Sequence, residues 1–323
     1  MIGAKPIRLG VVGGGEAATK AITALMDSPN VDLIAVACYP HELSGLVDTS
    51  GRAESYEELL GRDDIDTIYI ATPNDTHVPL AIRAIQCDKN VLIEKPMGLS
   101  YKDVSRLCDY EDKRVFIAIA FKKRFGSAVG IMKDIAVAAA RRLKIQFHWT
   151  IPMPLASNWR CDPRMSGGGV TVDLGSHILD LLEYLLGSIA EIEAEMEMVE
   201  GSTCVDASSH INLHFASGAV GRVNLGWREN ILCQRLTFSS DMTDVTLERI
   251  GPKCDLLRGE AFGKRIERTF SPDEEYRKLV HALSRRSENG ERSIPTLRDG
   301  LRNHQLIEAV YKSALERRTV CVL

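Results

Sequence analysis

The sequence predicts an α/β protein of two domains, a parallel sheet with helices on both faces followed by a larger, mostly antiparallel, open-faced sheet. Two observations predict this. In residues 7–121, short apolar runs alternate with helical patterns, which is the arrangement of right-handed βαβ units. After residue 188, stretches of alternating polar and apolar side chains are joined by Gly, Ser or Asp turns, as in antiparallel strands. We therefore predict domains 1–122 and 123–323, with the alternative that a C-terminal segment packs back on the first.

The first half is interpreted as strand and helix in turn. The apolar run "IRLGVVG" is typical of a buried parallel strand, and a helical pattern follows from Glu16 to Met26. A turn at Ser28, Pro29 and Asn30 separates this helix from the next strand. The remaining strands are predicted in "VDLIAVACY", "DTIYIATP", "NVLIEKP" and "RVFIAIAF". Further helices are predicted in "HVPLAIRAIQC" and "SYKDVSRLCDYE".

The second half begins with a helix over residues 173–186 and then changes character. Strands are predicted in "AEIEAEMEMV", "SSHINLHFA", "AVGRVNLGW", "QRLTFSS" and "DVTLERI". Helices near residues 272–286 and 298–316 complete the domain.

Composition limits the class of protein. The chain has 323 residues, 45% of them hydrophobic and 26% charged, as expected for about two globular domains. A net charge of -4 without a basic cluster argues against a nucleic-acid partner. The sequence shows neither a secretory signal nor a run of about 20 apolar residues, so we expect a cytoplasmic location and no membrane contact. Eight cysteines without a CxxC pair argue for reduced thiols and against a zinc ribbon.

A glycine triplet follows the first strand and opens the first helix in "GVVGGGEAATKA". Its Gly13-x-Gly15-x-x-Ala18 spacing matches a dinucleotide fingerprint, in which the glycines permit a tight turn and close approach of the backbone to a pyrophosphate. The alternative is a glycine-rich turn without a ligand. A P-loop is excluded because the Gly-Lys-Ser/Thr ending is missing. The loop predicts cofactor contacts from Gly13, Gly14, Gly15, Glu16 and Ala17.

The second strand bears on the choice between NAD and NADP. An acidic residue that binds the ribose hydroxyls of NAD is expected at its end, where the sequence has Cys38. Because no carboxylate repels a 2'-phosphate there, we lean slightly toward NADP. Tyr39 or His41 would contact the adenosine end of the cofactor, and Cys38 is included among the predicted contacts.

Two further stretches carry candidate chemistry. Lys95 follows the strand "NVLI", and ligands of open α/β sheets bind beyond the carboxyl ends of strands, although a solvated lysine is the alternative. Asp173 and His177 stand four residues apart, on one face of a helix. A carboxylate beside a histidine orients the ring for proton transfer near neutral pH. The alternative is a buried histidine bonded to a helix neighbour.

Other arrangements are less well supported. His210 and His214 lie on one face of a strand, but neither a cysteine nor a carboxylate completes an evident metal set with them. We therefore predict no metal. The chain contains no Tyr-x-x-x-Lys sequence, which argues against a short-chain dehydrogenase.

The chain contains, in this order, the segments "GVVGGGEAA", "IATPNDTHVPLAIRAI", "NVLIEKP", "NWR" and "GGGVTVDLGSHILDLLEYLLG". Together they resemble the glucose-fructose oxidoreductase / inositol dehydrogenase / rhizopine-catabolism family, Gfo/Idh/MocA. The tail "PTLRDGLRNHQLIEAVYKSALERRTVCV" resembles the family's closing helix and strand. The resemblance implies a Rossmann domain, a C-terminal α/β domain with a large, mostly antiparallel sheet, and hydride transfer between NAD(P) and a sugar, polyol or related carbonyl.

The resemblance also implies roles for individual residues. Lys95, Asp173 and His177 become the catalytic set, with His177 as acid or base and Lys95 orienting the reacting oxygen. The same three residues and Arg124 would bind substrate. The implied cofactor contacts beyond the glycine loop are Thr72, Pro73, Asn74, His77, Glu94, Lys95, Trp159 and Arg160.

Two alternative functions stay open at this point. One is a non-catalytic NAD(P)-binding sensor or regulator on the same fold, because fold does not determine function. The other is an oxidoreductase of a non-sugar substrate, such as a dihydrodiol or a bilin. We further expect a homodimer or homotetramer through the open face of the C-terminal sheet, with apolar positions supplied by "INLHF" and "RVNLGW".

Overall fold

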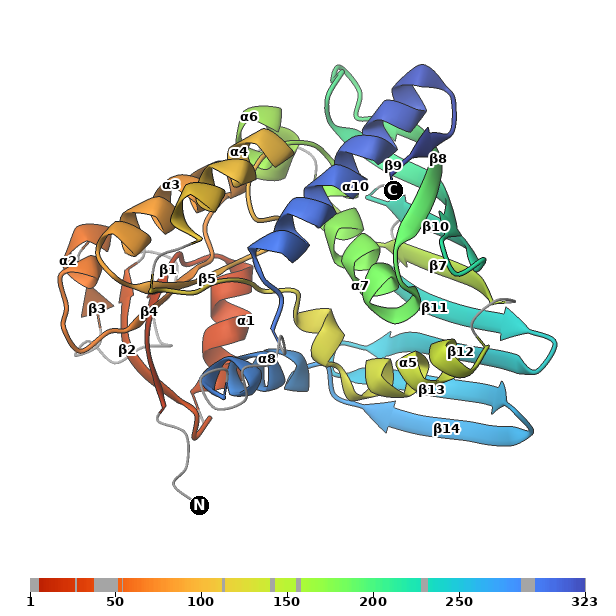
Figure 1. Ribbon diagram of the computed structural model, residues 1–323, viewed down its shortest axis with the longest axis horizontal. Helices are drawn as coiled ribbons and strands as arrows, with labels where there is room; N and C mark the ends of the chain where they lie inside the picture. Colours follow the sequence, from red (N-terminus) through yellow and green to blue (C-terminus); the bar gives the residue numbers. More distant parts are fainter. Residues whose placement is uncertain are drawn as a thin grey trace. The chain divides into compact units, whose positions relative to one another are not determined.

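The computed structural model describes most of the chain as two compact units (Figure 1). The first unit comprises Met1–Lys122 and Asp273–Leu301, and the second Lys123–Pro272 and Arg302–Leu323. The described residues are 6–26, 28–37, 52–53, 55–111, 114–139, 143–154, 158–227, 232–285 and 294–322. A parallel sheet in the first unit and a mostly antiparallel sheet in the second confirm the predicted fold class.

The parallel sheet has the strand order β3-β2-β1-β4-β5-β6. The chain begins in the middle of the sheet, builds toward one edge, and then returns to build the other, so the order reverses between β1 and β4. In sheets of this kind ligands bind at such a switch point. The strands are β1 (Ile7–Val12), β2 (Val31–Ala37), β3 (Arg52–Ala53), β4 (Thr67–Ile70), β5 (Asn90–Ile93) and β6 (Ile117–Ile119).

Helices of the first unit pack on the sheet through alternate strand residues. Ile68 and Ile70 of β4 join the apolar core that includes Val78 of α3, whereas Tyr69 between them hydrogen-bonds to Glu94. Helix α1 packs against α8. The helices are α1 (Glu16–Leu25), α2 (Tyr56–Leu60), α3 (Asn74–Gln86), α4 (Tyr101–Ser105) with the 3-10 turn η2 (Arg106–Tyr110), and α8 (Glu274–Ser284).

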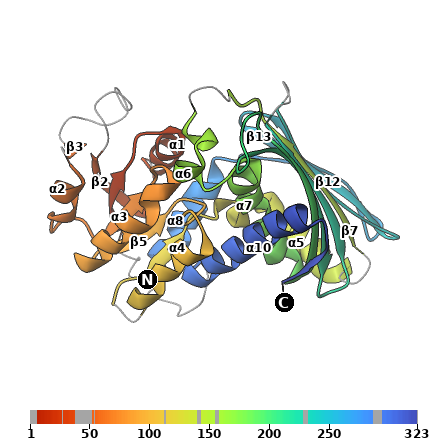
Figure 2. The same cartoon turned by 90° about the horizontal axis from the view of Figure 1, so that it is seen from above.

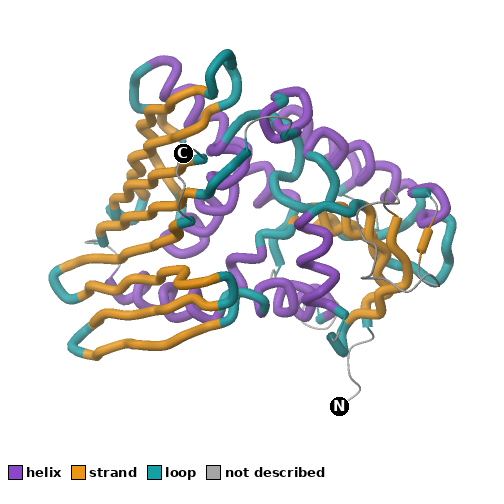
Figure 3. Tube along the Cα trace, turned by 180° about the vertical axis from the view of Figure 1, so that it is seen from behind, coloured by secondary structure: helices purple, strands orange, loops and turns teal. Residues whose placement is uncertain are grey.

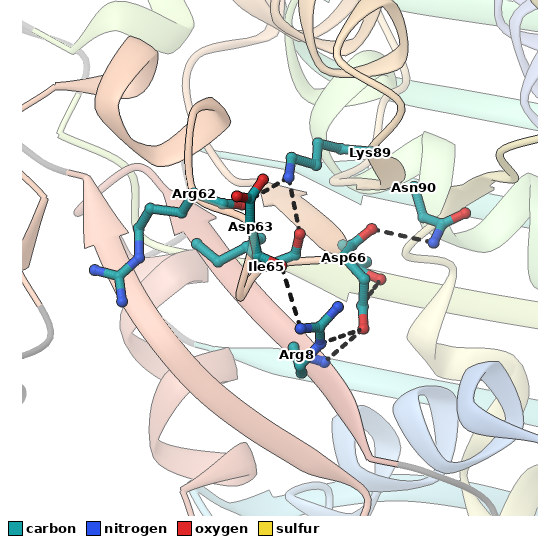
Figure 4. Close-up of polar contacts among 8 residues, drawn as sticks. Arg8, Arg62, Asp63, Ile65, Asp66, Lys89 and Asn90 are labelled. Carbon is teal, nitrogen blue, oxygen red and sulfur yellow. Dashed lines mark hydrogen bonds and ion pairs between the residues drawn. The ribbon is translucent and has the colours of Figure 1, made fainter.

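A polar network joins the amino ends of the central strands, opposite the ligand edge (Figure 4). The buried Lys89 ammonium donates to the carbonyl oxygens of Arg62 and Ile65, at 2.7 and 2.9 Å. Arg8 of β1 binds the Asp66 carboxylate, and the Asn90 amide donates to the Asp66 carbonyl at 3.1 Å. Because these groups satisfy one another, we interpret the network as structural.

The large sheet of the second unit has the order β14-β13-β12-β11-β7-β10-β9-β8-β15, and Figure 3 shows its strands as one layer. Strand β7 lies in its interior, parallel to β10 and antiparallel to β11. Strands β7, β13 and β14 were not predicted from the sequence. The strands are β7 (Lys144–Thr150), β8 (Ile189–Met198), β9 (Asp206–Phe215), β10 (Val220–Gly226), β11 (Cys233–Ser240), β12 (Thr243–Gly251), β13 (Cys254–Ala261), β14 (Lys264–Phe270) and β15 (Val320–Cys321).

Helices cover one face of the large sheet (Figure 2). Their apolar residues share a core with the strands, as Leu182 of α7 and Val310 of α10 do with Phe147 of β7. The helical segments are the 3-10 turn η3 (Lys122–Phe125), α5 (Ser127–Ala139), the 3-10 turn η5 (Trp159–Cys161), α6 (Pro163–Ser166), the π-helix η6 (Thr171–Gly175), α7 (Ser176–Leu186) and the long α10 (Leu297–Glu316). Among the residues in the described ranges, no helix is long and apolar enough to cross a membrane.

The apolar positions expected on the open face are in fact in the core. Ile211 and Leu213 of "INLHF" and Val223 and Leu225 of "RVNLGW" are 0–2% exposed and pack in the core of the second unit. The exposed side chains within these two stretches, His214 and Arg222, are polar, and next to them His210 is bonded to Asn224 across the strands at 2.8 Å. The prediction of an apolar open face is therefore wrong, because the helices cover the one apolar face that the alternation provides.

Candidate active site

The first glycine triplet lies between β1 and α1 and adopts the geometry of a dinucleotide loop. Gly13 has φ +118°, and a Cβ there would lie 2.2 Å from the Ala71 carbonyl oxygen. Gly15 is the N-cap of α1, and a Cβ on it would meet no heavy atom of the described residues within 4 Å. Glu16 and Ala17 begin the helix, whose N-terminus carries the partial positive charge that suits a pyrophosphate. A tight turn, open space and a helix N-terminus together fit a dinucleotide.

The segment after β4 lies beside this loop. Besides the Ala71 carbonyl, the Thr72 methyl group lies 3.3 Å from the position of a Cβ on Gly13. Pro73 is the N-cap of α3, and the helix begins with the buried Asn74. Two of the segments predicted to contact cofactor therefore meet at the switch point of the parallel sheet.

His77 occupies the interior of the first unit. Its side chain is 1% exposed, and its Nδ1 and Nε2 each lie 2.8 Å from a carbonyl oxygen, of Pro96 and of Thr72 respectively. The imidazole thereby links the segment after β4 to the segment after β5. We infer that its part in the cofactor site is indirect, holding two loops together.

Stability should depend on the protonation of His77. Burial lowers the pKa of His77 below its ordinary value, with smaller opposite effects from its backbone hydrogen bonds and Glu94, while Lys95 lowers it further. A lowered folded-state pKa favours the neutral ring, so its contribution is present above the ordinary pKa and lost as pH falls through the folded-state value. Between pH 7.5 and 5.5, we expect the Tm of the unchanged protein to fall further than the Tm of the His77→Gln variant. Calorimetry of both proteins across this pH range measures the two slopes. Equal slopes would contradict this, because other groups cancel in the comparison.

Glu94 follows β5 and is 5% exposed. Its Oε1 accepts hydrogen bonds from the Tyr69 and Tyr276 hydroxyls, at 2.5 and 2.8 Å, and its Oε2 accepts one from the Lys95 backbone N–H at 3.1 Å. Burial, followed by the charge of Glu94, raises the pKa of both tyrosines well above the ordinary value, so both hydroxyls stay protonated donors. Glu94 thus anchors the backbone of Lys95, a role that the sequence analysis did not predict.

In the second unit, Asp173 lies within the π-helix Thr171–Gly175, which continues into α7. The predicted α-helix from residue 173 therefore begins in a wider turn, and π-helical turns are frequent at functional sites. The Asp173 carboxylate lies 3.7 Å from Nε of Arg160, whose guanidinium stacks over the Trp159 ring at 4.6 Å. Three residues that the resemblance assigned to the site thus lie together.

His177 is buried in the first turn of α7, with 8% of its surface exposed. Its ring centroid lies 5.7 Å from that of Trp149 on β7, at an interplanar angle of 33°. The buried Lys123 ammonium lies 5.0 Å from the centroid of the same Trp149 ring. Trp149 and Lys123 were not predicted. Lys123 directly precedes Arg124, which the resemblance assigned to the substrate site, whereas Trp149 belongs to a strand that was not predicted.

Arg124 is fixed by a two-point ion pair. Its Nε and Nη2 lie 2.9 and 2.5 Å from the carboxylate oxygens of Asp180 on α7, and the Asp180 side chain is 3% exposed. Its guanidinium also lies 5.3 Å from the Tyr184 ring. A contact between Arg124 and substrate stays a prediction, and the ion pair indicates that this arginine also ties the start of the second unit to α7.

Some predicted contacts lie outside the described residues, namely Cys38, Tyr39 and His41. Lys95 belongs to the first unit, and Asp173 and His177 to the second. Among the side chains that the structure describes, no group of three or more His, Cys, Asp or Glu residues is arranged to hold a metal ion.

The glycine loop and the strand order define the first unit as a dinucleotide-binding Rossmann domain. Known proteins agree. The family model described as "Oxidoreductase family, NAD-binding Rossmann fold" matches residues 7–120, and the C-terminal domain model of GFO/IDH/MocA proteins matches residues 134–238. The chain belongs to the Gfo/Idh/MocA oxidoreductase family, as the resemblance indicated, and its cofactor is NAD or NADP.

Individual relatives illustrate the range of the family. The chain is 28% identical over 271 residues to a D-xylose 1-dehydrogenase (NADP(+)) of Haloferax volcanii, which covers 80% of this chain and 81% of that protein. The fold matches the aldose-aldose oxidoreductase of Caulobacter crescentus in complex with glycerol, with a TM-score of 0.88, 22% identity and coverage of 98% and 100%. It also matches levoglucosan dehydrogenase in complex with NADH, with a TM-score of 0.85, 19% identity and coverage of 99% and 100%.

Proposed function

We propose that the protein is an NAD(P)-dependent dehydrogenase or reductase acting on a hydroxyl or carbonyl group of a sugar, a polyol or a sugar derivative. The observation that carries this proposal is the helical segment that holds Asp173 against Arg160 and His177 against Trp149, in a chain of this oxidoreductase family. The relatives named above are a xylose and a levoglucosan dehydrogenase and an aldose-aldose oxidoreductase, which favours a sugar-like substrate.

In the proposed reaction each residue has a distinct role. The cofactor, when bound, supplies or accepts the hydride at its nicotinamide ring. His177 removes the proton from the reacting hydroxyl group in the oxidative direction and returns it in the reductive direction. Lys95 donates a hydrogen bond to the reacting oxygen and stabilises the negative charge that develops there. Asp173 orients this pair, and its ion pair with Arg160 supports that orientation.

The environment of His177 suits proton transfer. Histidine is the side chain whose ordinary pKa lies closest to neutral pH, and this ring is mostly buried beside the Trp149 indole, tilted 33° to it. Packing against Trp149 limits rotation of the imidazole, so the ring is held in one orientation. Glu94 holds the Lys95 backbone in a comparable way.

A substrate screen tests the function. The purified protein is mixed with NAD or NADP and, one at a time, with pentoses, hexoses, anhydrosugars, polyols and sugar nucleotides, and the absorbance of the reduced nicotinamide is followed in both directions. Turnover of at least one sugar or polyol is expected. Cofactor binding without any turnover would overturn the proposed enzymatic function and favour a sensor or regulator. Turnover of only a dihydrodiol or bilin would overturn the proposal of a sugar-like substrate.

We infer a preference for NADP over NAD from the end of the second strand. The sequence places Cys38 where NAD-binding proteins carry a ribose-binding acid, so no carboxylate repels a 2'-phosphate. Fluorescence titration should give a lower Kd for NADPH than for NADH, by about threefold or more. A lower Kd for NADH would contradict the inference.

A further inference from the structure

A buried carboxylate stands at the start of the helical segment that carries Asp173 and His177. Asp206, the first residue of β9, is 0% exposed. Its Oδ1 accepts hydrogen bonds from the Gly169 backbone N–H at 2.9 Å and from the Tyr311 hydroxyl at 2.5 Å. Its Oδ2 accepts from the Thr171 backbone N–H and hydroxyl, at 2.9 and 2.6 Å. Both carboxylate oxygens are therefore used by groups at one helix end.

These contacts make Asp206 a helix cap supplied by a distant strand. The first backbone N–H groups of a helix lack partners within the helix and are usually capped by a side chain at its start. The residues at this start are Gly168 and Gly169, which have no side chain to offer. The carboxylate of Asp206 fills the role and places a negative charge at the positive end of the helix dipole.

The second glycine triplet is explained by the same cap. A Cβ on Gly169 would lie 2.0 Å from the Asp206 carbonyl oxygen, and a Cβ on Gly168 would lie 2.3 Å from the Tyr311 hydroxyl oxygen. Gly167 has φ +79°, in the left-handed region that favours glycine. The triplet lets β9 and α10 approach the helix start closely enough to bind it.

Helix α10 holds the same helical segment at two more points. The Asn303 side-chain amide donates to the carbonyl oxygen of Ser176, the residue before His177, at 2.9 Å. Arg302 binds the Glu183 carboxylate near the other end of α7, at 2.8 Å. Tyr311 completes the series at the capped end, where its hydroxyl also accepts from the Gly169 N–H at 3.1 Å.

We propose that Asp206 and Tyr311 are positioning residues, which set the place and rotation of the helical segment bearing Asp173 and His177 for the reaction. This inference rests on the proposed function, because it assigns these two residues to the same site. Because their side chains are bonded to the start of the helical segment, we assign neither residue a contact with the reacting atoms. Loss of the cap lets the start of the segment shift, and a shift of about 1 Å in a reacting group can cost on the order of a hundredfold in rate.

Burial shifts the ionisation of both groups. Burial, and then the charge of Asp206, raises the pKa of Tyr311 well above its ordinary value, so its hydroxyl remains a donor at assay pH. Burial also raises the pKa of Asp206, while the hydrogen bonds from Thr171 and Tyr311 act in the opposite direction.

The test compares Asp206→Asn and Tyr311→Phe with the unchanged enzyme, using a substrate found in the screen. The asparagine side chain retains the shape, but its NH2 group faces donors and cannot accept from them. We expect kcat to fall roughly thirty- to hundredfold for Asp206→Asn and about tenfold for Tyr311→Phe. The KM and the Kd for the cofactor should change by less than about twofold, and the pH profile of kcat should shift.

Matched controls separate positioning from a loss of stability. Asp299→Asn removes the negative charge of a carboxylate whose Oδ2 accepts from the Thr296 backbone N–H and hydroxyl, at 2.8 and 2.9 Å. Tyr56→Phe removes a tyrosine hydrogen bond to the Leu80 carbonyl oxygen, at 2.7 Å. Both controls should lower Tm without changing kcat or its pH profile well below Tm. If the Asp206 and Tyr311 variants behave like these controls, the proposal is overturned.

A readout without substrate keeps the two proposals distinguishable. The Cε1–H NMR resonance of His177, assigned by its loss in His177→Ala, should move and titrate differently in Asp206→Asn but not in Asp299→Asn. That result supports positioning by the cap even if no sugar is turned over. The absence of turnover would overturn the proposed function but not the positioning role. An unchanged His177 resonance in folded Asp206→Asn would overturn the positioning role, whatever the activity.

Discussion

We expect His177→Ala to lower kcat by about a thousandfold, because general acid-base catalysis by one side chain contributes a factor on the order of 10²–10⁴ to the rate. The substitution removes the only proton-transfer group that we assign to the reacting hydroxyl. Lys95→Ala should lower kcat to a similar degree, through the loss of the hydrogen bond to the reacting oxygen. The Kd for NAD(P)H, measured by fluorescence titration, should stay within about threefold for His177→Ala.

The control for this prediction is His210→Ala. His210 lies on the polar face of the large sheet, where it is bonded to Asn224. Its replacement by alanine should therefore leave kcat unchanged. The double variant His177→Ala/Lys95→Ala should be hardly slower than either single variant, since groups that act as a unit are not additive. A His177→Ala protein with more than about a tenth of the original kcat would exclude His177 as the acid or base.

The two outer glycines of the first triplet should respond in opposite ways to alanine. Gly13→Ala should destabilise the fold by at least about 2 kcal/mol, through backbone strain and a clash, because Gly13 has φ +118° and its Cβ would lie 2.2 Å from a carbonyl oxygen. Gly15→Ala should leave Tm nearly unchanged, since its Cβ meets no heavy atom within 4 Å in the part of the chain that the structure describes. It should nevertheless weaken cofactor binding at least about tenfold, by occupying the space where the backbone approaches a pyrophosphate.

Calorimetry and fluorescence titration on the same two variants separate these effects. Each glycine is the control for the other, because both substitutions add one methyl group to the same loop. Should Gly15→Ala bind NAD(P)H as tightly as the unchanged protein, the assignment of this loop to the pyrophosphate would be wrong. A Gly13→Ala protein as stable as the original would show that the turn can relax.

The strand and helix alternation of the first half could be predicted because each element carries its own signal. Buried parallel strands are short apolar runs and the helices between them have a different period, so β1, α1, β4, α3 and β5 were all found, with ends that differ by a few residues. Strand β14 was missed for the opposite reason. Its sequence "KRIERTF" is mostly charged and exposed at the edge of the sheet, and charge of this kind protects an edge while hiding the pattern.

Which face of the large sheet is buried and which is exposed could be predicted only in part. Alternation in "INLHF" shows that one face of the strand is apolar, but it does not show whether helices cover that face. In the structure, α5, α7 and α10 share a core with the apolar face of the large sheet. The polar face is therefore the one that stays exposed. In the same way, Glu94 and His77 can be recognised in the sequence as members of motifs, but their hydrogen-bond partners cannot. Glu94 accepts from the Tyr276 hydroxyl, and the His77 ring lies between two loop carbonyl oxygens.

By itself, the sequence determined the family and the cofactor class, since these depend on local motifs that are visible in one chain. Through the resemblance to that family it also indicated the candidate catalytic groups. The tertiary structure alone decided what holds those groups. Asp206 and Tyr311 are far in sequence from the helix start that they bind, and no local pattern links them to it. The second glycine triplet shows this division: its presence is plain in the sequence, but its reason, the close approach of a strand and a helix to a capped helix end, is a contact that only folding creates.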